Sequence, residues 1–245
     1  MRLCALKIAG RNAAAAVRPG WRREFVLRDA RIWFEKHAKY ISHLDLNRFM
    51  LRAVRRAKLP LWVTEGFNPH PYINFALPLS LGFESENDCF DVRITEDMPD
   101  EELCERLRAV MPPEIPVTGI SAPVYAFKKI EYAAFSLFFE SEGSIDELGG
   151  FLTGDTIPVR KMGKKARKQH SEGELIDLME YAKRLDFTAQ GESAGRADVI
   201  LPAGSRQNIN PQLLVTAAEQ TLGGGLFCKR ILRSALLLND LSAFC

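Results

Sequence analysis

Apolar and polar residues follow two different periods in residues 29–121, and these periods predict alternating strands and helices. Aromatic and β-branched residues at 31–35 predict a strand, and apolar residues at helical spacing predict a helix from Ser42 to about Ala57. The remaining predicted elements of this half are strands at 61–64 and 90–94, a helix at 99–111 opened by Asp97, and a strand at 116–121. The predicted order is β-α-β-β-α-β.

The second half of the chain is predicted to repeat this order. Its predicted elements are a strand at 130–140, a helix at 144–152 capped by Ser144, strands at 156–160 and 199–201, a helix at 210–222 and a strand at 227–238, with 181–189 left unassigned. We therefore expect an α+β fold of two tandem ferredoxin-like (βαββαβ) units with antiparallel sheets. The predicted division is a basic extension at 1–28 and domains at 29–123 and 124–245, joined near 123–128.

Composition favours an ordinary globular protein in the cytoplasm. The chain has 245 residues, 47% of them hydrophobic and 26% charged, with a net charge of +2, so its overall charge indicates no class of partner. Five cysteines are scattered and never form a C-x-x-C pair, which argues against a disulfide framework or a zinc site. No apolar run reaches the ~18 residues that a membrane span needs, so no membrane partner is expected.

The first 28 residues are strongly basic, since seven Lys and Arg side chains accompany one acid, Glu24. An Arg-rich, acid-poor start with an alanine run is typical of an organellar transit peptide. The other interpretation is an upstream extension that is partly disordered or a weak helix. We favour the extension, because nothing else in the chain indicates an organelle, and we assign it no function.

The start of the first predicted helix is one candidate site. Ser42 is placed to cap the helix, Asp45 stands three residues later, and His43 lies between them. Amide dipoles at a helix start favour an anion, and Ser42 and His43 add hydrogen-bond donors, so one interpretation is an anion pocket. The alternative is that Ser42 and Asp45 only cap the helix and that His43 is a surface residue.

The second candidate is the loop at 66–71, where two prolines restrict the residues before them, Asn68 and His70. His70 can take a proton, bind a metal or hydrogen-bond a ligand; the alternative is a turn histidine bonded to a nearby backbone carbonyl. If His43 and His70 converge, they form an acid–base pair or, with Asp45, a metal site. Their spacing matches no metal signature, so we expect no metal.

Two basic clusters indicate nucleic acid as a candidate partner. The first is Arg48, Arg52, Arg55, Arg56 and Lys58 on the first helix; the second is Arg160, Lys161, Lys164, Lys165, Arg167 and Lys168 in the second half. These cations would follow a phosphate backbone, while Trp62, Phe67 and Tyr72 stack on bases. The alternative is a solvated helix face and a basic loop. The chain has no P-loop, dinucleotide-binding or nucleophile-elbow motif, and we expect no cofactor.

These motifs carry a resemblance to a known family. The matching positions are Arg31, Ser42-His43-Leu44-Asp45, Arg48, Arg52, Arg55-Arg56, Leu59-Pro60, Gly66-Phe67-Asn68-Pro69-His70-Pro71, Leu77-Pro78-Leu79, Gly82 and Glu84-Ser85. With them the chain resembles the radical-SAM-linked protein family, an uncharacterised bacterial domain adjacent or fused to cobalamin-binding radical SAM proteins. The resemblance covers about residues 29–235 and implies a radical SAM protein as partner and a connection to RNA or the ribosome. The chain lacks the C-x-x-x-C-x-x-C triplet of a radical SAM enzyme.

Three hypotheses follow, and they leave open whether the chain is an enzyme. The leading one is an accessory module that binds RNA or presents a substrate to a radical SAM enzyme during RNA or ribosome-related modification. The second is a metal-independent acid–base enzyme that uses His43 and His70, for example in RNA processing. The third is a domain that only binds other proteins.

Overall fold

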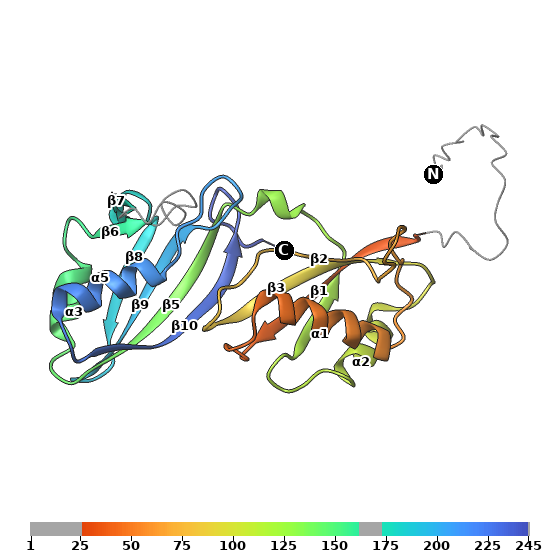
Figure 1. The fold of residues 1–245 in the computed structure, drawn as a ribbon, viewed down its shortest axis with the longest axis horizontal. Helices are drawn as coiled ribbons and strands as arrows, with labels where there is room; N and C mark the ends of the chain where they lie inside the picture. Colours follow the sequence, from red (N-terminus) through yellow and green to blue (C-terminus); the bar gives the residue numbers. More distant parts are fainter. Residues whose placement is uncertain (1–25, 162–172, 245) are drawn as a thin grey trace, which may run out of the picture.

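The computed structural model describes residues 26–161 and 173–244, which fold into a mixed α+β chain around a mainly antiparallel sheet (Figure 1). The elements of the first half are β1 (Arg28–Lys36), α1 (His43–Arg56), β2 (Ile73–Phe75), β3 (Phe83–Ile94), α2 (Asp100–Arg108) and β4 (Val117–Ser121). Helix α1 forms where the sequence predicts it, because four of its apolar side chains recur on one buried face: Leu46, Met50, Ala53 and Val54.

The second half begins with a short 3₁₀ turn at Phe127–Lys129. Its other elements are β5 (Tyr132–Ser141), α3 (Asp146–Leu152), β6 (Pro158–Lys161), β7 (Glu174–Asp177), a second 3₁₀ turn (Leu178–Glu180), β8 (Arg184–Ala189), β9 (Ala194–Pro202), α5 (Gln212–Leu222) and β10 (Leu226–Leu237). Helix α5 ends where Gly223 adopts a φ of 81°, a conformation that favours glycine.

Strands from both halves build one eight-stranded sheet. Its order is β4-β1-β3-β10-β5-β9-β8, and β2 also pairs with β3. The two halves meet where Ile231–Arg233 of β10 pair with Phe83–Ser85 of β3 in parallel, while the other strand pairs of this sheet are antiparallel. The α+β class is confirmed, and the tandem ferredoxin-like arrangement, like the domain division, stays a prediction.

Two hydrophobic cores lie on this sheet. The first packs α1 and α2 against the first-half strands, with Phe34 and Phe90 fully buried at its centre. The second lies among the second-half elements, and three residues of the first half, Leu79, Phe83 and Cys89, belong to it. The long strand β3 therefore contributes side chains to both cores.

Several predicted elements are corrected. Residues 61–64 make only isolated bridges, Leu61 to Ile94 and Val63 to Pro71, because they form the stem of a local hairpin, and β2 is the strand that joins the sheet. Helix α2 begins at Asp100 after Pro99, without a side-chain cap from Asp97. The predicted strand at 156–160 becomes β6, which pairs with β7 in a separate two-stranded sheet.

Two smaller differences concern the second half. Helix α3 starts at Asp146, and Ser144 Oγ accepts a hydrogen bond from Asp146 N at 3.1 Å. The unassigned segment at 181–189 contains β8, at the end of the sheet opposite β4. Within the described part of the chain, no helix is long and apolar enough to cross a membrane.

Candidate functional site

The start of α1 is built by a side-chain cap. Ser42 Oγ accepts a hydrogen bond from Asp45 N at 3.1 Å and donates one to Asp45 Oδ2 at 2.7 Å. Arg48 Nη1 lies 3.2 Å from Asp45 Oδ1. The hydrogen bond from Ser42, followed by that from Arg48, holds the pKa of Asp45 below its ordinary value. Both Ser42 and Asp45 are therefore engaged in capping the helix.

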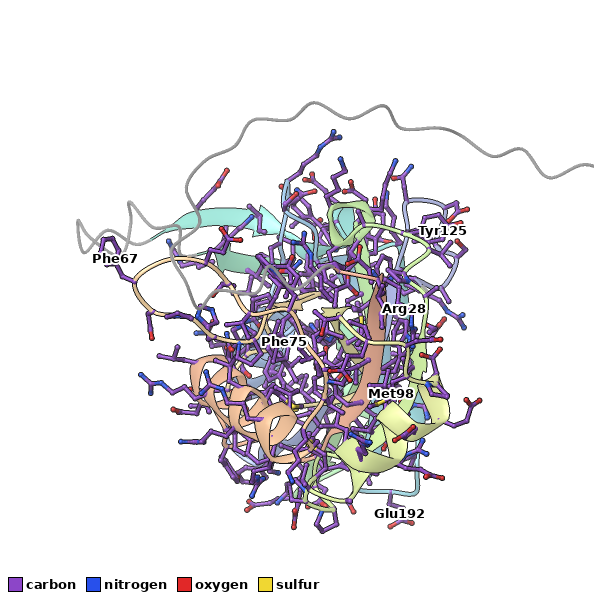
Figure 2. The ribbon with its side chains drawn as sticks, turned by 90° about the vertical axis from the view of Figure 1, so that its right-hand side faces the viewer. Arg28, Phe67, Phe75, Met98, Tyr125 and Glu192 are labelled. Atoms are coloured by element: carbon purple, nitrogen blue, oxygen red, sulfur yellow. The ribbon has the colours of Figure 1, made fainter. Side chains whose placement is uncertain are left out.

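The loop at 66–71 is the tip of a hairpin that begins after α1. Its stem is closed by hydrogen bonds from Thr64 N to His70 O at 2.8 Å and from Tyr72 N to Trp62 O at 2.9 Å. Residues 65–70 are exposed. Figure 2 shows Phe67 at the tip of this loop, which projects from the body of the molecule.

His70 is held by its own hairpin. Its Nδ1 lies 2.8 Å from the backbone oxygen of Asn68 and 3.3 Å from Thr64 Oγ1, and its backbone N–H donates to Thr64 Oγ1 at 3.2 Å. Because a carbonyl oxygen only accepts, the contact with Asn68 places a proton on Nδ1 of the ring. The alternative of a turn histidine bonded to a nearby carbonyl describes this geometry.

His43 lies in different surroundings, at the first turn of α1. Its ring meets Phe75 edge-on, with 5.2 Å between ring centroids, and it is half-buried. Burial lowers the pKa of His43, while Asp88 acts in the opposite direction and Arg233 in the same direction. Among the described residues, no hydrogen bond or ring contact joins His43 to His70, so the structure does not bring the two imidazoles together.

The charges near His43 form a buried cluster that the sequence did not reveal. We define this cluster as Lys36, Asp88 and Arg233, which are 1%, 4% and 1% exposed. Arg233 forms an ion pair with Asp88 and donates to the backbone oxygen of Leu77 at 3.2 Å. Lys36 Nζ donates to the backbone oxygen of Phe83 at 3.0 Å. Arg233 thus ties the last strand to β3 and to the segment before it, and Lys36 ties β1 to β3.

The buried cluster lies where β1, β3 and β10 adjoin. Lys36 pairs with Ser85 across β1 and β3, and Ser85 pairs with Arg233 across β3 and β10, so these three residues form one row across the sheet. Burial has the largest effect on the pKa of Lys36 and lowers it; Asp88 has the next largest effect and raises it. Within the described residues, Nε of Arg233 has no hydrogen-bond partner.

One sequence signal would have found part of the buried cluster. Asp88 stands two residues before Phe90, in the same alternation as Val92 and Ile94, and therefore faces the core side of its strand. A carboxylate at such a position requires a partner. The partner, Arg233, is 145 residues away, and only the pairing of β3 with β10 brings it near.

The basic face of α1, which we define as Arg48, Arg52, Arg55 and Arg56, is exposed to solvent. Arg56 Nη2 donates to the backbone oxygen of Val110 at 3.2 Å. Asp45 is the only carboxylate within the helix. In the second basic cluster, Arg160 and Lys161 lie on β6, whereas Lys164, Lys165, Arg167 and Lys168 lie outside the described residues. The contribution of those four residues to binding stays a prediction.

Metal ligation finds no support in residues 26–161 and 173–244. In these ranges no group of three or more His, Cys, Asp and Glu side chains is placed to hold a metal ion. Cys89, Cys104 and Cys228 carry free thiols. Burial raises the pKa of Cys89 to about 12 and that of Cys228 to about 11, so neither is activated as a thiolate.

Comparisons with known proteins place the sequence in context. Residues 30–211 match the family described as an uncharacterised protein conserved in bacteria (DUF2344). No curated protein matches the sequence. A chain from the crystal structure of a Cbf5-Nop10-Gar1 complex is similar with 10% identity and a TM-score of 0.49, covering 84% of this chain and 48% of that one. At that level the likeness carries no argument about function, and neither description mentions a radical SAM protein.

Proposed function

We propose that this chain, which belongs to the DUF2344 family of uncharacterised proteins conserved in bacteria, binds RNA through the basic face of α1. One observation carries the proposal: four arginines on the 14-residue helix are exposed, and a single carboxylate of the helix accompanies them. Guanidinium groups match phosphate geometry and stay charged at physiological pH. A helix face with this excess of positive charge suits a polyanion.

The arrangement of the basic face supports contact with a phosphate backbone. Leu46, Met50, Ala53 and Val54 hold the opposite side of α1 in the core, so the arginines are presented on a fixed support. The ion pair between Arg48 and Asp45 is exposed and therefore weak. Phosphates can therefore replace the Asp45 carboxylate as the partner of Arg48 at little cost in free energy. A helix face that is only solvated would show no preference for RNA.

Anisotropy titrations with labelled RNA at several salt concentrations test the proposal. Arg52→Ala/Arg55→Ala should weaken binding at least about tenfold and reduce the slope of log affinity against log salt by about 1.5 to 2. The control is Arg184→Ala/Lys229→Ala, which removes the same charge from exposed side chains of the second half. Equal losses in both variants, or none in either, would contradict a specific role for α1.

We also propose that the RNA-bound chain serves a radical SAM enzyme as an accessory or substrate-presenting module. The sequence resemblance over residues 29–235 supports this step. Affinity purification from the native bacterium, followed by mass spectrometry, should recover a radical SAM protein together with RNA. Recovery of RNA without such an enzyme would refute the partnership and leave RNA binding intact.

A further inference from the structure

Phe67 is the most exposed large apolar side chain among the described residues, with a relative exposure of 112%. It stands at the tip of the hairpin, apart from both hydrophobic cores (Figure 2). Its sequence neighbours Glu65, Gly66, Asn68 and Pro69 are exposed and offer no second large apolar side chain. A single aromatic ring held fully in water stabilises nothing in the fold, since burial is what makes such a ring favourable.

The hairpin holds this ring in a defined position. Pro69 and Pro71 restrict the backbone beside it, and hydrogen bonds join His70 to Asn68 and Thr64 within the loop. The backbone bond from Thr64 N to His70 O, 2.8 Å long, closes the loop below the tip. The ring is therefore presented by a braced loop, which reduces the conformational entropy that binding would cost.

The stem below the tip carries two aromatic side chains that contact a cation of β3. The Arg93 guanidinium lies 5.0 Å from the ring centroid of Trp62 and 4.6 Å from that of Tyr72. These two aromatic residues are partly exposed, and their rings are 5.9 Å apart. Planar groups are thus available along the hairpin as well as at its tip, beside the Arg93 guanidinium, which also lies 3.7 Å from Asp29 Oδ1.

The hairpin follows directly on the helix that carries the basic face. The chain leaves α1 at Arg56 and reaches the stem at Trp62, where Trp62 N donates to the backbone oxygen of Arg93. A polyanion that follows the arginines toward the end of α1 therefore approaches the hairpin. Aromatic rings next to cationic side chains are the combination that binds unpaired nucleic-acid bases.

We propose that Phe67, at the tip of the hairpin, stacks on an unpaired RNA base; we call the hairpin the stacking finger. This inference rests on the proposed function. The ligand class is therefore single-stranded or loop RNA. In a duplex the bases are already stacked on one another, and the ring has no free face to cover. One exposed aromatic ring without apolar neighbours offers too little apolar area for a membrane anchor, which needs a broad apolar face.

Fluorescence titrations with 2-aminopurine, placed in a single-stranded RNA or in the same RNA as a duplex, test the stacking finger. Phe67→Ala should weaken single-strand binding by about 5- to 150-fold, the equivalent of one stacked base, and abolish the fluorescence quenching. Duplex affinity should stay within about twofold, and Phe67→Trp should restore single-strand binding. Phe227→Ala, which removes another exposed phenylalanine in the second half, is the control.

The outcomes separate this inference from the proposed function. If Arg52→Ala/Arg55→Ala weakens binding and Phe67→Ala does not, RNA binding stands and the stacking finger is refuted. If Phe67→Ala weakens single-strand and duplex binding equally, the assignment to unpaired bases fails. If the wild-type chain binds no RNA, the proposed function fails, and loss of vesicle or protein binding in Phe67→Ala would assign the ring to that ligand.

Discussion

At the scale of single residues, the surroundings of His43 determine its protonation. Burial is the largest effect and lowers its pKa, and of the two charges of the buried cluster that act on it, Asp88 raises the pKa and Arg233 lowers it. The folded chain therefore favours the neutral ring more strongly than the unfolded chain does. A neutral imidazole beside buried charges accepts a proton only at lower pH than an exposed histidine.

We expect an NMR titration to give His43 a pKa below its ordinary value of 6.5, and Asp88→Asn to lower that pKa further. Between the folded and the unfolded pKa the unfolded state binds more protons at this site, so acidification from about pH 6.5 through the folded pKa should reduce the free energy of unfolding. Urea denaturation of His43→Gln at the same pH values should show a smaller decrease in the free energy of unfolding than the wild type. A His43 pKa at or above 6.5 would contradict the burial argument.

At the scale of elements, the contact between β3 and β10 combines a short parallel pairing with a buried ion pair. Three residues of each strand are in register there, and Arg233 and Asp88 are nearly inaccessible to solvent. A buried pair contributes little compared with apolar residues of the same volume, but the loss of one partner leaves an uncompensated charge. Each of the two side chains therefore compensates the buried charge of the other across the contact between β3 and β10.

Arg233→Met should lower the free energy of unfolding by about 3–5 kcal/mol, because it leaves the Asp88 carboxylate buried without its partner. The double variant Arg233→Met/Asp88→Leu should recover much of that loss, since it removes both charges. Urea denaturation of the two single variants and the double variant measures the coupling. Additive losses would show that the two side chains do not compensate each other.

At the scale of the whole molecule, one sheet links two hydrophobic cores. Strand β3 supplies Phe90 to the first core and Phe83 to the second, and Leu79 from the β2–β3 connection also enters the second core. Unfolding of the second half therefore exposes apolar side chains of the first half. We expect the two halves to unfold together despite their separate cores.

Leu214→Ala tests this coupling, because Leu214 is fully buried in the second core. The change should destabilise the protein by about 2–5 kcal/mol through the cavity it leaves. Trp62 lies in the first half, whereas Trp33 packs against the second core, so a background with Trp21→Phe and Trp33→Phe leaves Trp62 as the reporter of first-half unfolding. The tryptophan transition should shift with the change; an unchanged transition would show that the halves unfold independently. Ala126→Gly in the connection between the halves is a control outside both cores.

Prediction from sequence succeeded where the signal is local. Helix α1 and its Ser42 cap, the long strands β5 and β10, and the end of α5 at Leu222 all follow from patterns within a few residues. The strand predicted at 61–64 failed, because a short apolar run does not specify its pairing partner: Leu61 makes a single bridge to Ile94 of β3 and Val63 a single bridge to Pro71 within the hairpin. Ser42 and His43 lie at the start of α1 and His70 lies in the hairpin loop, while the roles of the candidate site residues stay predictions.

By itself, the sequence determined the α+β class, the cap of α1, the basic face of that helix and the proline-restricted loop at 66–71, because each depends on residues close together in the chain. Only the tertiary structure decided that β10 joins β3, that Lys36, Asp88 and Arg233 meet, and that His43 rather than His70 lies beside them. These contacts join residues as far as 145 positions apart in the sequence. Hydrophobic patterning shows which face of a strand is buried, but it does not specify which distant strand will pair with it.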